Sequence, residues 1–303
     1  MRFLEQYLFH IVRLRPFRGI TFTHRTGCEG AGSQANCIMN AMTFARACGL
    51  PYVHTPLTMI AHADRPMCEW VTAWETFFNL GLGEVAYDAE TLGVVNYTPE
   101  VYREIELCLG WRGRGDQLAD CFKALIPELR RKYYSNKSPR TTEEVMVALH
   151  MRRGDVTVQN NSNMFTSTQK AMHTVNAVKS VLDSQQIPHT IRVYSQGNIE
   201  EFAELTSLGV EFFLDADPIW TLQELIEADV LIMAKSSFSS YAGIISSGIK
   251  IYEPADWSEL AASVEFILND PLDDWLRCEV DGTVDEVALE HQLLIRTKAK
   301  LNF

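Results

Sequence analysis

The sequence predicts an α/β protein made of two Rossmann-like domains that face each other across a cleft. Strand-like and helix-like segments alternate strictly from residue 144 to residue 252, a pattern typical of a parallel, doubly wound sheet. Near the N-terminus, a glycine-rich turn separates a strand-like from a helix-like segment, which is the order of a βαβ unit. A length of 303 residues suits two domains of about 150 residues each. The polar segment 134–140 resembles a linker, so we expect domains at 1–138 and 139–303.

Composition excludes several classes of protein. With 47% hydrophobic and 22% charged residues the chain is globular rather than disordered, and its net charge of −12 is wrong for a nucleic-acid-binding surface. No apolar run approaches the roughly 18 residues that a membrane span needs. The seven cysteines include no CxxC pair and are expected to be free thiols in a reducing compartment. We therefore expect a soluble, cytoplasmic protein.

The N-terminal half begins with a short amphipathic helix rather than a signal peptide, because arginines follow its apolar residues. The pattern then predicts a strand at 19–23, a glycine turn at 27–33, a helix at 34–48 and a strand at 51–57. Gly49 is placed as the residue that ends the helix, with Pro51 just beyond it. An aromatic-rich stretch at 70–82 looks helical, and the rest of this half shows no clear period.

The C-terminal half is more regular. Strands are predicted at 144–150, 190–194, 210–214, 230–234 and 250–252, and helices at 165–182, 199–208, 222–228 and 239–247. The tail from residue 270 looks like a last helix.

The segment from His150 to Asp155 reads His-Met-Arg-Arg-Gly-Asp and follows a predicted buried strand. Its two adjacent arginines need anionic partners, and a guanidinium fork matches a phosphate in a bidentate way. At the carboxyl edge of a parallel sheet, this loop suits a diphosphate. The alternative is an ion-pair network of arginines and carboxylates between the domains.

A second loop, from Lys235 to Ser240, joins a predicted strand to a predicted helix and contains four serines. Serine hydroxyls and the free amides of the helix N-terminus can bind a phosphate together. Together with Arg152, the turn forms a two-sided diphosphate clamp. Helix capping by one of these serines is the simpler alternative.

The glycine turn does not match the common nucleotide fingerprints. Ser33 and Gln34 stand where a P-loop needs lysine followed by serine or threonine, and Ala35 replaces the third glycine of GxGxxG. A P-loop kinase or sulfotransferase using residues 27–34 is thus a minor alternative. The turn still permits close approach of a sugar or an acceptor to the backbone.

Taken together, the HxRRGD segment, the Ser-Ser-Phe-Ser turn at 236–239 and the N-terminal glycine turn resemble the fucosyltransferase-like glycosyltransferases of the GT-B fold. That group includes the α1,2-, α1,6- and protein O-fucosyltransferases, and related stand-alone enzymes that use other donors such as UDP-xylose. The resemblance covers about residues 20–255. It implies an inverting, metal-independent transferase, without a cofactor, that moves fucose or another sugar such as xylose from a GDP- or UDP-linked donor to a glycan hydroxyl.

The resemblance also implies roles for individual residues. Arg152 looks like the arginine that holds the β-phosphate of the donor, and Ser237 and Ser239 look like contacts to its phosphate and nucleoside. The full donor-side set is His150, Arg152, Arg153, Gly154, Ser236, Ser237, Phe238 and Ser239. The N-terminal domain would hold the acceptor, and the acceptor-side candidates are Gly30, Gly32, Gln34 and Glu75. The family's Gly-Asn-Gln appears here as Gly32-Ser33-Gln34.

The chemistry requires charge stabilisation and a base. Arg152 would stabilise the negative charge that grows on the leaving diphosphate, and a carboxylate would take the proton of the acceptor hydroxyl. The candidates for this base are Asp64, Asp155 and Glu75. One alternative is a metal-dependent transferase that uses Asp215 and Asp217, an Asp-x-Asp pair after a strand. Another is a non-catalytic relative that binds nucleotide or sugar without turnover.

Overall fold

The computed structural model describes residues 18–23, 29–88, 93–98, 115–140, 144–254 and 275–301. These described residues form two compact units, one ending at Lys137 and one beginning at Ser138, and we call them unit 1 and unit 2. The helix predicted in the first residues, Gly27 and Cys28 of the glycine turn, and Cys108 lie outside the described residues. Among the described residues, Cys37, Cys48, Cys68, Cys121 and Cys278 are free.

Unit 1 is a parallel α/β unit. Its elements are β1 (Gly19–Thr21), α2 (Ala31–Ala47), β2 (Val53–His54), α3 (Met67–Phe78), β3 (Val85–Ala86), β4 (Val94–Asn96) and α5 (Gly115–Tyr134). Strand β1 pairs with β4 and β2 pairs with β3, both in parallel. A parallel bridge between Ile20 and Tyr52 joins the two pairs, so the strands follow the order β3-β2-β1-β4. The βαβ unit predicted around the glycine turn is therefore confirmed.

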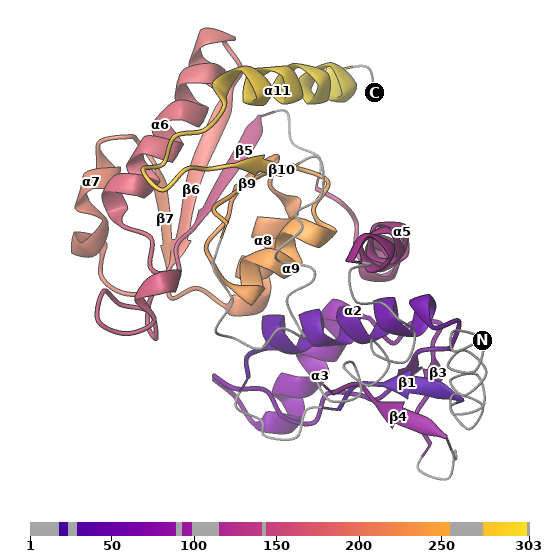
Figure 1. Cartoon of the computed structure of the whole chain (residues 1–303). Coiled ribbons are helices and arrows are strands. Elements are labelled where there is room, and N and C mark those ends of the chain that lie inside the picture. The colour runs from indigo at the N-terminus through magenta and orange to yellow at the C-terminus, as the bar shows by residue number, and fades with distance from the viewer. Residues whose placement is uncertain are drawn as a thin grey trace, which may run out of the picture. The chain divides into compact units, whose positions relative to one another are not determined.

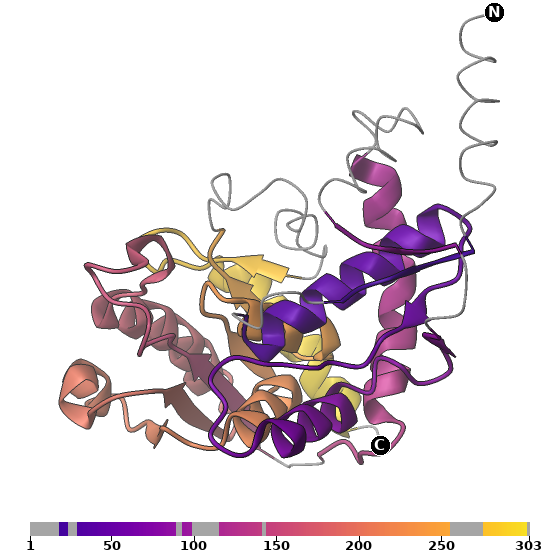
Figure 2. The ribbon, with the colours of Figure 1, turned by 90° about the horizontal axis from the view of Figure 1, so that it is seen from below.

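Helix α2 is the buried centre of unit 1. It lies against β1 and α5, as the indigo and magenta helices of Figure 2 show, and 14 of its 17 residues are buried. Gly49 follows it with a φ of +67°, a left-handed conformation that suits a glycine after a helix. Helix α3 lies against α5, and its Trp70, Trp74 and Phe78 are buried. The helix predicted at 70–82 is confirmed, displaced by a few residues.

Unit 2 contains one six-stranded sheet in which all pairings are parallel. Its strands are β5 (Val145–His150), β6 (His189–Ser195), β7 (Glu211–Leu214), β8 (Val230–Ile232), β9 (Ile249–Tyr252) and β10 (Trp275–Arg277). Its helices are α6 (Thr168–Ser184), α7 (Ala203–Thr206), α8 (Pro218–Glu227), α9 (Ser237–Ile245) and α11 (Glu286–Leu301), with short 3₁₀ turns at Ser162–Met164 and Ile199–Phe202. Every strand and helix predicted from residue 144 to residue 252 is present.

The strand order of unit 2 is β7-β6-β5-β8-β9-β10. Numbered along the chain, this is the order 3-2-1-4-5-6 of the Rossmann fold, in which the direction of winding reverses between the first and fourth strands. The reversal lies between β5 and β8, which pair through Val147–Leu149 and Val230–Ile232. In such sheets, ligands bind at the carboxyl ends of these two strands.

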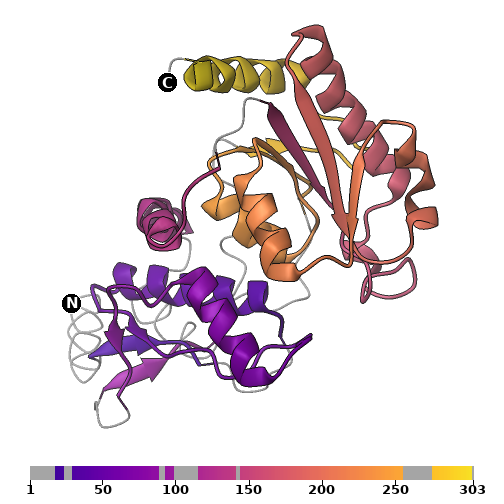
Figure 3. The ribbon, with the colours of Figure 1, turned by 180° about the vertical axis from the view of Figure 1, so that it is seen from behind.

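Helices cover both faces of the sheet, as Figures 1 and 3 show. Val145, Val147 and Leu149 share a core with apolar residues of α6 and α11. On the opposite face α8 and α9 pack side by side. The near-continuous apolar sequence of β5 follows from this burial on both faces.

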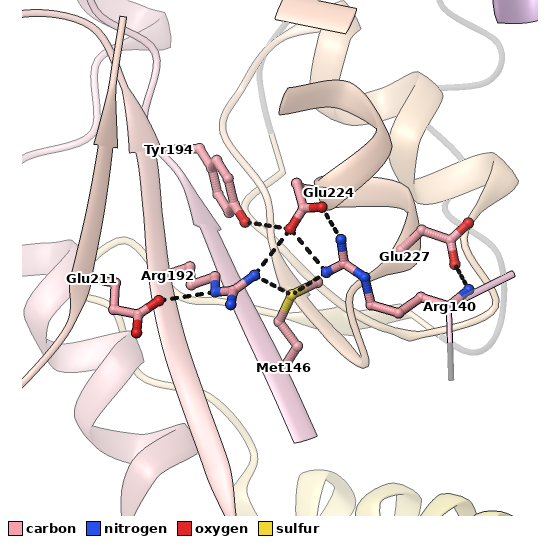
Figure 4. A network of polar contacts seen from close by, with 7 residues as sticks. All are labelled: Arg140, Met146, Arg192, Tyr194, Glu211, Glu224 and Glu227. Atoms are coloured by element: carbon pink, nitrogen blue, oxygen red, sulfur yellow. Dashed lines mark hydrogen bonds and ion pairs between the residues drawn. The ribbon is translucent and has the colours of Figure 1, made fainter. Parts of the chain in front are cut away.

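A polar network ties the start of unit 2 to the α8 face of the sheet (Figure 4). Glu224 of α8 is 1% exposed, and its carboxylate accepts hydrogen bonds from Arg140, Arg192 and Tyr194. Arg140 also donates its backbone N–H to Glu227. A buried carboxylate is tolerated here because two guanidinium groups surround it.

Candidate functional site

Both sequence motifs of unit 2 lie where the sheet reverses its winding. The HxRRGD segment starts at the last residue of β5, and the serine-rich turn runs from the end of β8 into α9. Since β5 and β8 are adjacent and parallel, their carboxyl ends share one edge. The structure thus brings together the two loops that the sequence singled out.

A hydrogen bond joins the two loops directly. His150 Nδ1 lies 2.6 Å from Ser239 Oγ, which also accepts the backbone N–H of Ala234 at 3.1 Å. The ring of Phe238 lies 5.5 Å from the imidazole, centroid to centroid. Burial, together with the positive charge of Arg152, lowers the pKa of His150 to about 3. His150 is therefore a neutral residue that positions the two loops, and at neutral pH it is no acid catalyst.

Arg152 and Asp155 form a bidentate ion pair within the loop. Arg152 Nε and Nη2 lie 3.1 and 2.5 Å from the two carboxylate oxygens of Asp155. The side chains remain 29% and 42% exposed, so the pair is open to solvent. An incoming phosphate would find the guanidinium fork ordered, and would compete with Asp155 for it.

Arg153 points elsewhere and anchors the loop. It is 7% exposed, and it donates to the backbone oxygens of Arg152 at 3.0 Å and Thr166 at 2.8 Å. Its guanidinium lies 4.3 Å from the centroid of the Phe165 ring, a cation–π contact. These contacts give Arg153 a structural role in this structure. Its predicted donor contact stays a prediction.

Gly154 completes the tight turn of this loop. Its φ of +79° is a conformation that side chains rarely adopt, and a Cβ at this position would lie 2.8 Å from Gln196 Oε1. The glycine therefore sets the path of the loop between Arg153 and Asp155.

The serines of the turn before α9 have different roles. Ser236 is the N-cap of α9, since its side chain accepts the N–H of Ser239 at 3.2 Å. Capping thus accounts for Ser236. Ser239 is fully buried and bridges to His150, while Ser237 and Phe238 occupy the half-buried first turn of α9. Of the predicted donor contacts, Ser237 and Phe238 are the most open in this turn.

Lys235 belongs to a charged cluster that the sequence analysis missed. Its Nζ lies 3.3 Å from Glu253 Oε2, and Lys170 of α6 lies 2.7 Å from the same oxygen. The three side chains come from the start of α6 and from the ends of β8 and β9. Only Lys235 stands in a recognisable motif, so no sequence signal pointed to its partners.

Asp215 and Asp217, the Asp-x-Asp pair, each accept a backbone N–H. Asp217 is the N-cap of α8 and accepts the N–H of Trp220 at 2.9 Å, while Asp215 accepts the N–H of Gly197 at 3.3 Å. Asp215 has a φ of +51°. Within the described segments, no group of three or more His, Cys, Asp or Glu residues is placed to hold a metal ion.

In unit 1, the acceptor-side residues Gly30, Gly32 and Gln34 lie at the start of α2. Gly30 is its N-cap, Gly32 lies in its first turn, and Gln34 is fully buried. Gln34 Nε2 donates to the carbonyls of Glu29 and Met59, at 3.0 and 2.8 Å. The side chain of Gln34 thereby connects the loop after β2 to the glycine turn through hydrogen bonds.

Glu75 lies in α3, and both of its carboxylate oxygens are occupied. Oε1 accepts the N–H of Leu57 at 2.5 Å, and Oε2 lies 3.2 Å from His54 Nε2.

Asp64 lies in the loop after β2 and is half exposed, and Arg65 Nε donates to it at 2.7 Å. This hydrogen bond holds the pKa of Asp64 below its usual range, which weakens it as a base. Asp64 remains the more accessible of these two candidates.

No family model matches the chain, and no curated protein matches it. Among solved structures, E. coli heptosyltransferase WaaC with ADP is similar with a TM-score of 0.41 and 10% sequence identity, covering 92% of this chain and 99% of that chain. Among the described residues, no helix is long and apolar enough to cross a membrane.

Proposed function

We propose that this protein is a GT-B glycosyltransferase that transfers a sugar from a nucleotide-diphosphate donor to a glycan hydroxyl with inversion and without a metal. The observation that carries the proposal is the His150–Ser239 hydrogen bond across the reversal of the unit 2 sheet. It joins the doubled-arginine loop to the N-terminus of α9 at the place where Rossmann-like sheets bind nucleotides.

The proposed mechanism uses charge development at the leaving group. As the bond from the sugar C1 to the diphosphate breaks, negative charge grows on the β-phosphate. Arg152 supplies a guanidinium fork and α9 supplies its positive N-terminal end. Asp64 or Asp155 takes the proton of the acceptor hydroxyl. Asp155 can do so once the donor has displaced it from Arg152. Fucose from a GDP-linked donor, or xylose from a UDP-linked donor, are the sugars that the sequence motif favours.

Calorimetric titration of the whole chain with GDP, UDP and ADP tests the donor site, first with EDTA and then with Mn²⁺. We expect metal-free binding of GDP or UDP that Arg152→Ala weakens by roughly 10- to 100-fold, because hydrogen bonds to charged groups contribute about 1.5–3 kcal/mol. Arg277→Ala is the matched control, since Arg277 is an exposed arginine of β10.

The result also separates the alternatives. Binding that appears only with Mn²⁺ would favour a metal-dependent site at Asp215 and Asp217. Metal-free binding without hydrolysis or transfer of any matching sugar nucleotide would favour a non-catalytic relative. Equal affinities of wild type and Arg152→Ala would remove the diphosphate role of the arginine loop.

A further inference from the structure

Three charged side chains meet at the carboxyl edge of the unit 2 sheet. Lys235 follows β8, Glu253 follows β9, and Lys170 lies in the first turn of α6. Strands β5, β8 and β9 are parallel neighbours, and the loop after β5 leads into α6, so all three residues lie at the same edge. We call these three residues the lysine cluster. The arginine loop and the turn before α9 lie at this edge too.

The lysine cluster contains one positive charge without a counter-charge. Both ammonium groups lie against a single carboxylate oxygen, Glu253 Oε2, which is 2.7 Å from Lys170 Nζ and 3.3 Å from Lys235 Nζ. Neither lysine forms another ion pair with any of the described residues. One carboxylate can balance only one of the two ammonium groups, so the cluster has a surplus positive charge.

This surplus charge is largely removed from water. The side chains of Lys170, Lys235 and Glu253 are only 10%, 11% and 14% exposed. Lys170 Nζ is buried and, despite its short distance to Glu253, has no hydrogen bond of suitable geometry within the described part of the chain. Buried charges are costly unless they are paired. An anionic ligand would therefore be stabilised at the cluster.

We propose that the lysine cluster binds the terminal phosphate of a nucleoside diphosphate, with Lys235 as the contacting residue. Lys235 directly precedes the serine that caps α9, whose N-terminus faces the donor in the proposed function. An ammonium group has three N–H donors, so contact with Glu253 leaves donors for a phosphate. Lys170 and Glu253 position the Lys235 side chain.

The inference rests on the proposed function and adds a second cation to its donor site. A transferase that works without a metal must balance the charge of the leaving diphosphate with its own groups. Arg152 provides one positive charge from the loop after β5, and Lys235 provides another from the loop after β8. Because these two strands are adjacent, the two cations can hold the diphosphate from neighbouring loops.

Two substitutions in the cluster should act in opposite directions. Lys235→Met leaves Lys170 and Glu253 as a balanced pair, so the free chain should be at least as stable as the wild type. Its affinity for nucleoside diphosphates should fall roughly 10- to 100-fold. Glu253→Gln removes the only carboxylate of the cluster, so the free chain should be less stable but its affinity should rise at least about threefold. A misfolded variant cannot show this gain.

The experiment combines calorimetry and urea unfolding of the full chain. The probes are GDP, UDP, GMP, UMP and inorganic pyrophosphate, with EDTA and at constant ionic strength. Because the cluster is assigned to the terminal phosphate, the affinities for GMP and UMP should change less than about twofold in Lys235→Met. The matched controls are Lys179→Met, at a more exposed lysine of α6 paired with Asp183, and Glu279→Gln, at an exposed glutamate after β10.

The remaining outcomes each contradict a stated part of the inference. If the wild type bound GDP or UDP and neither Lys235→Met nor Glu253→Gln changed the affinity, the inference would be wrong and the donor site would stand. Reduced affinity in both variants would refute the surplus charge. Equal losses for mono- and diphosphates would refute the assignment to the terminal phosphate.

Failure of the proposed function has a different result. Binding of pyrophosphate that Lys235→Met removes, without binding of any nucleotide, would leave an anion site and refute its donor role together with the transferase function. A wild-type chain that binds none of the probes would refute both proposals.

Discussion

His150 Nδ1 and Ser239 Oγ, 2.6 Å apart, connect the ends of the two strands between which the unit 2 sheet reverses. Both side chains can affect ligand binding through the position of their loops, without contacting the ligand. The hydrogen bond fixes the arginine loop relative to the first turn of α9. Binding of a diphosphate by the two loops, as proposed above, would depend on this support. Small displacements of the contacting groups would weaken such binding.

Ser239→Ala should therefore weaken nucleotide binding and stability together. The substitution leaves the imidazole of His150 and the N–H of Ala234 without their partner in a buried place, at a cost of about 1–3 kcal/mol. Urea unfolding and calorimetry with GDP and UDP measure the two effects. Ser207→Ala, at an exposed serine after α7, serves as the control. A Ser239→Ala chain as stable as the control would show that the bridge contributes nothing.

His150 should also make the fold sensitive to acid. Its pKa is about 3 in the folded chain, whereas an unfolded histidine titrates near 6.5. The unfolded chain therefore takes up a proton first, and the stability that neutral His150 provides is lost as the pH falls from about 6.5 towards 3. The slope contributed by one group is at most about 1.4 kcal/mol per pH unit.

The measurement is the free energy of unfolding at several pH values for the wild type and for His150→Gln. We expect the variant to be less stable at pH 7 but to lose less stability between pH 6.5 and pH 4. Parallel curves for the two chains would contradict this assignment.

Asp64→Asn should reduce the rate of transfer while nucleotide affinity stays nearly constant, if Asp64 is the base. Because Arg65 lowers the pKa of Asp64, the rate should show no loss from protonation of this group above about pH 5. Kinetics with the sugar nucleotide identified by calorimetry measure both quantities. Glu69→Gln, an exposed carboxylate of α3, is the control. An unchanged rate would exclude Asp64 as the base and leave Asp155 as the candidate.

Glu224→Gln should strongly destabilise unit 2. The substitution removes the charge that faces Arg140 and Arg192, and breaking a buried ion pair from one side costs about 3–5 kcal/mol. Chemical unfolding checks this value. Glu211→Gln breaks only the exposed pair with Arg192 and should cost at most about 1 kcal/mol. Equal losses of unfolding free energy in the two variants would show that burial of Glu224 does not make its ion pairs in Figure 4 stronger than an exposed pair.

The elements of unit 2 could be predicted because their signals are local. Strands buried on both faces give apolar runs such as Val145–Leu149, and glycine, proline and serine mark the turns between them. The same reasoning failed for β3, β4 and β10, which have two or three residues each and are too short to show a period. Helix α5 was likewise not assigned.

Local patterns by themselves determined that the chain is α/β and that the two motif loops follow strands. Only the tertiary structure decided what each side chain in those loops does. Arg152 and Arg153 are neighbours of identical type, yet one pairs with Asp155 at the surface and the other is buried against Phe165. Likewise Ser236 caps α9 whereas Ser239 reaches His150. The reason is physical: helix and strand propensities arise between near neighbours, whereas partners such as Lys170 and Glu253 meet only when the order of the strands is set.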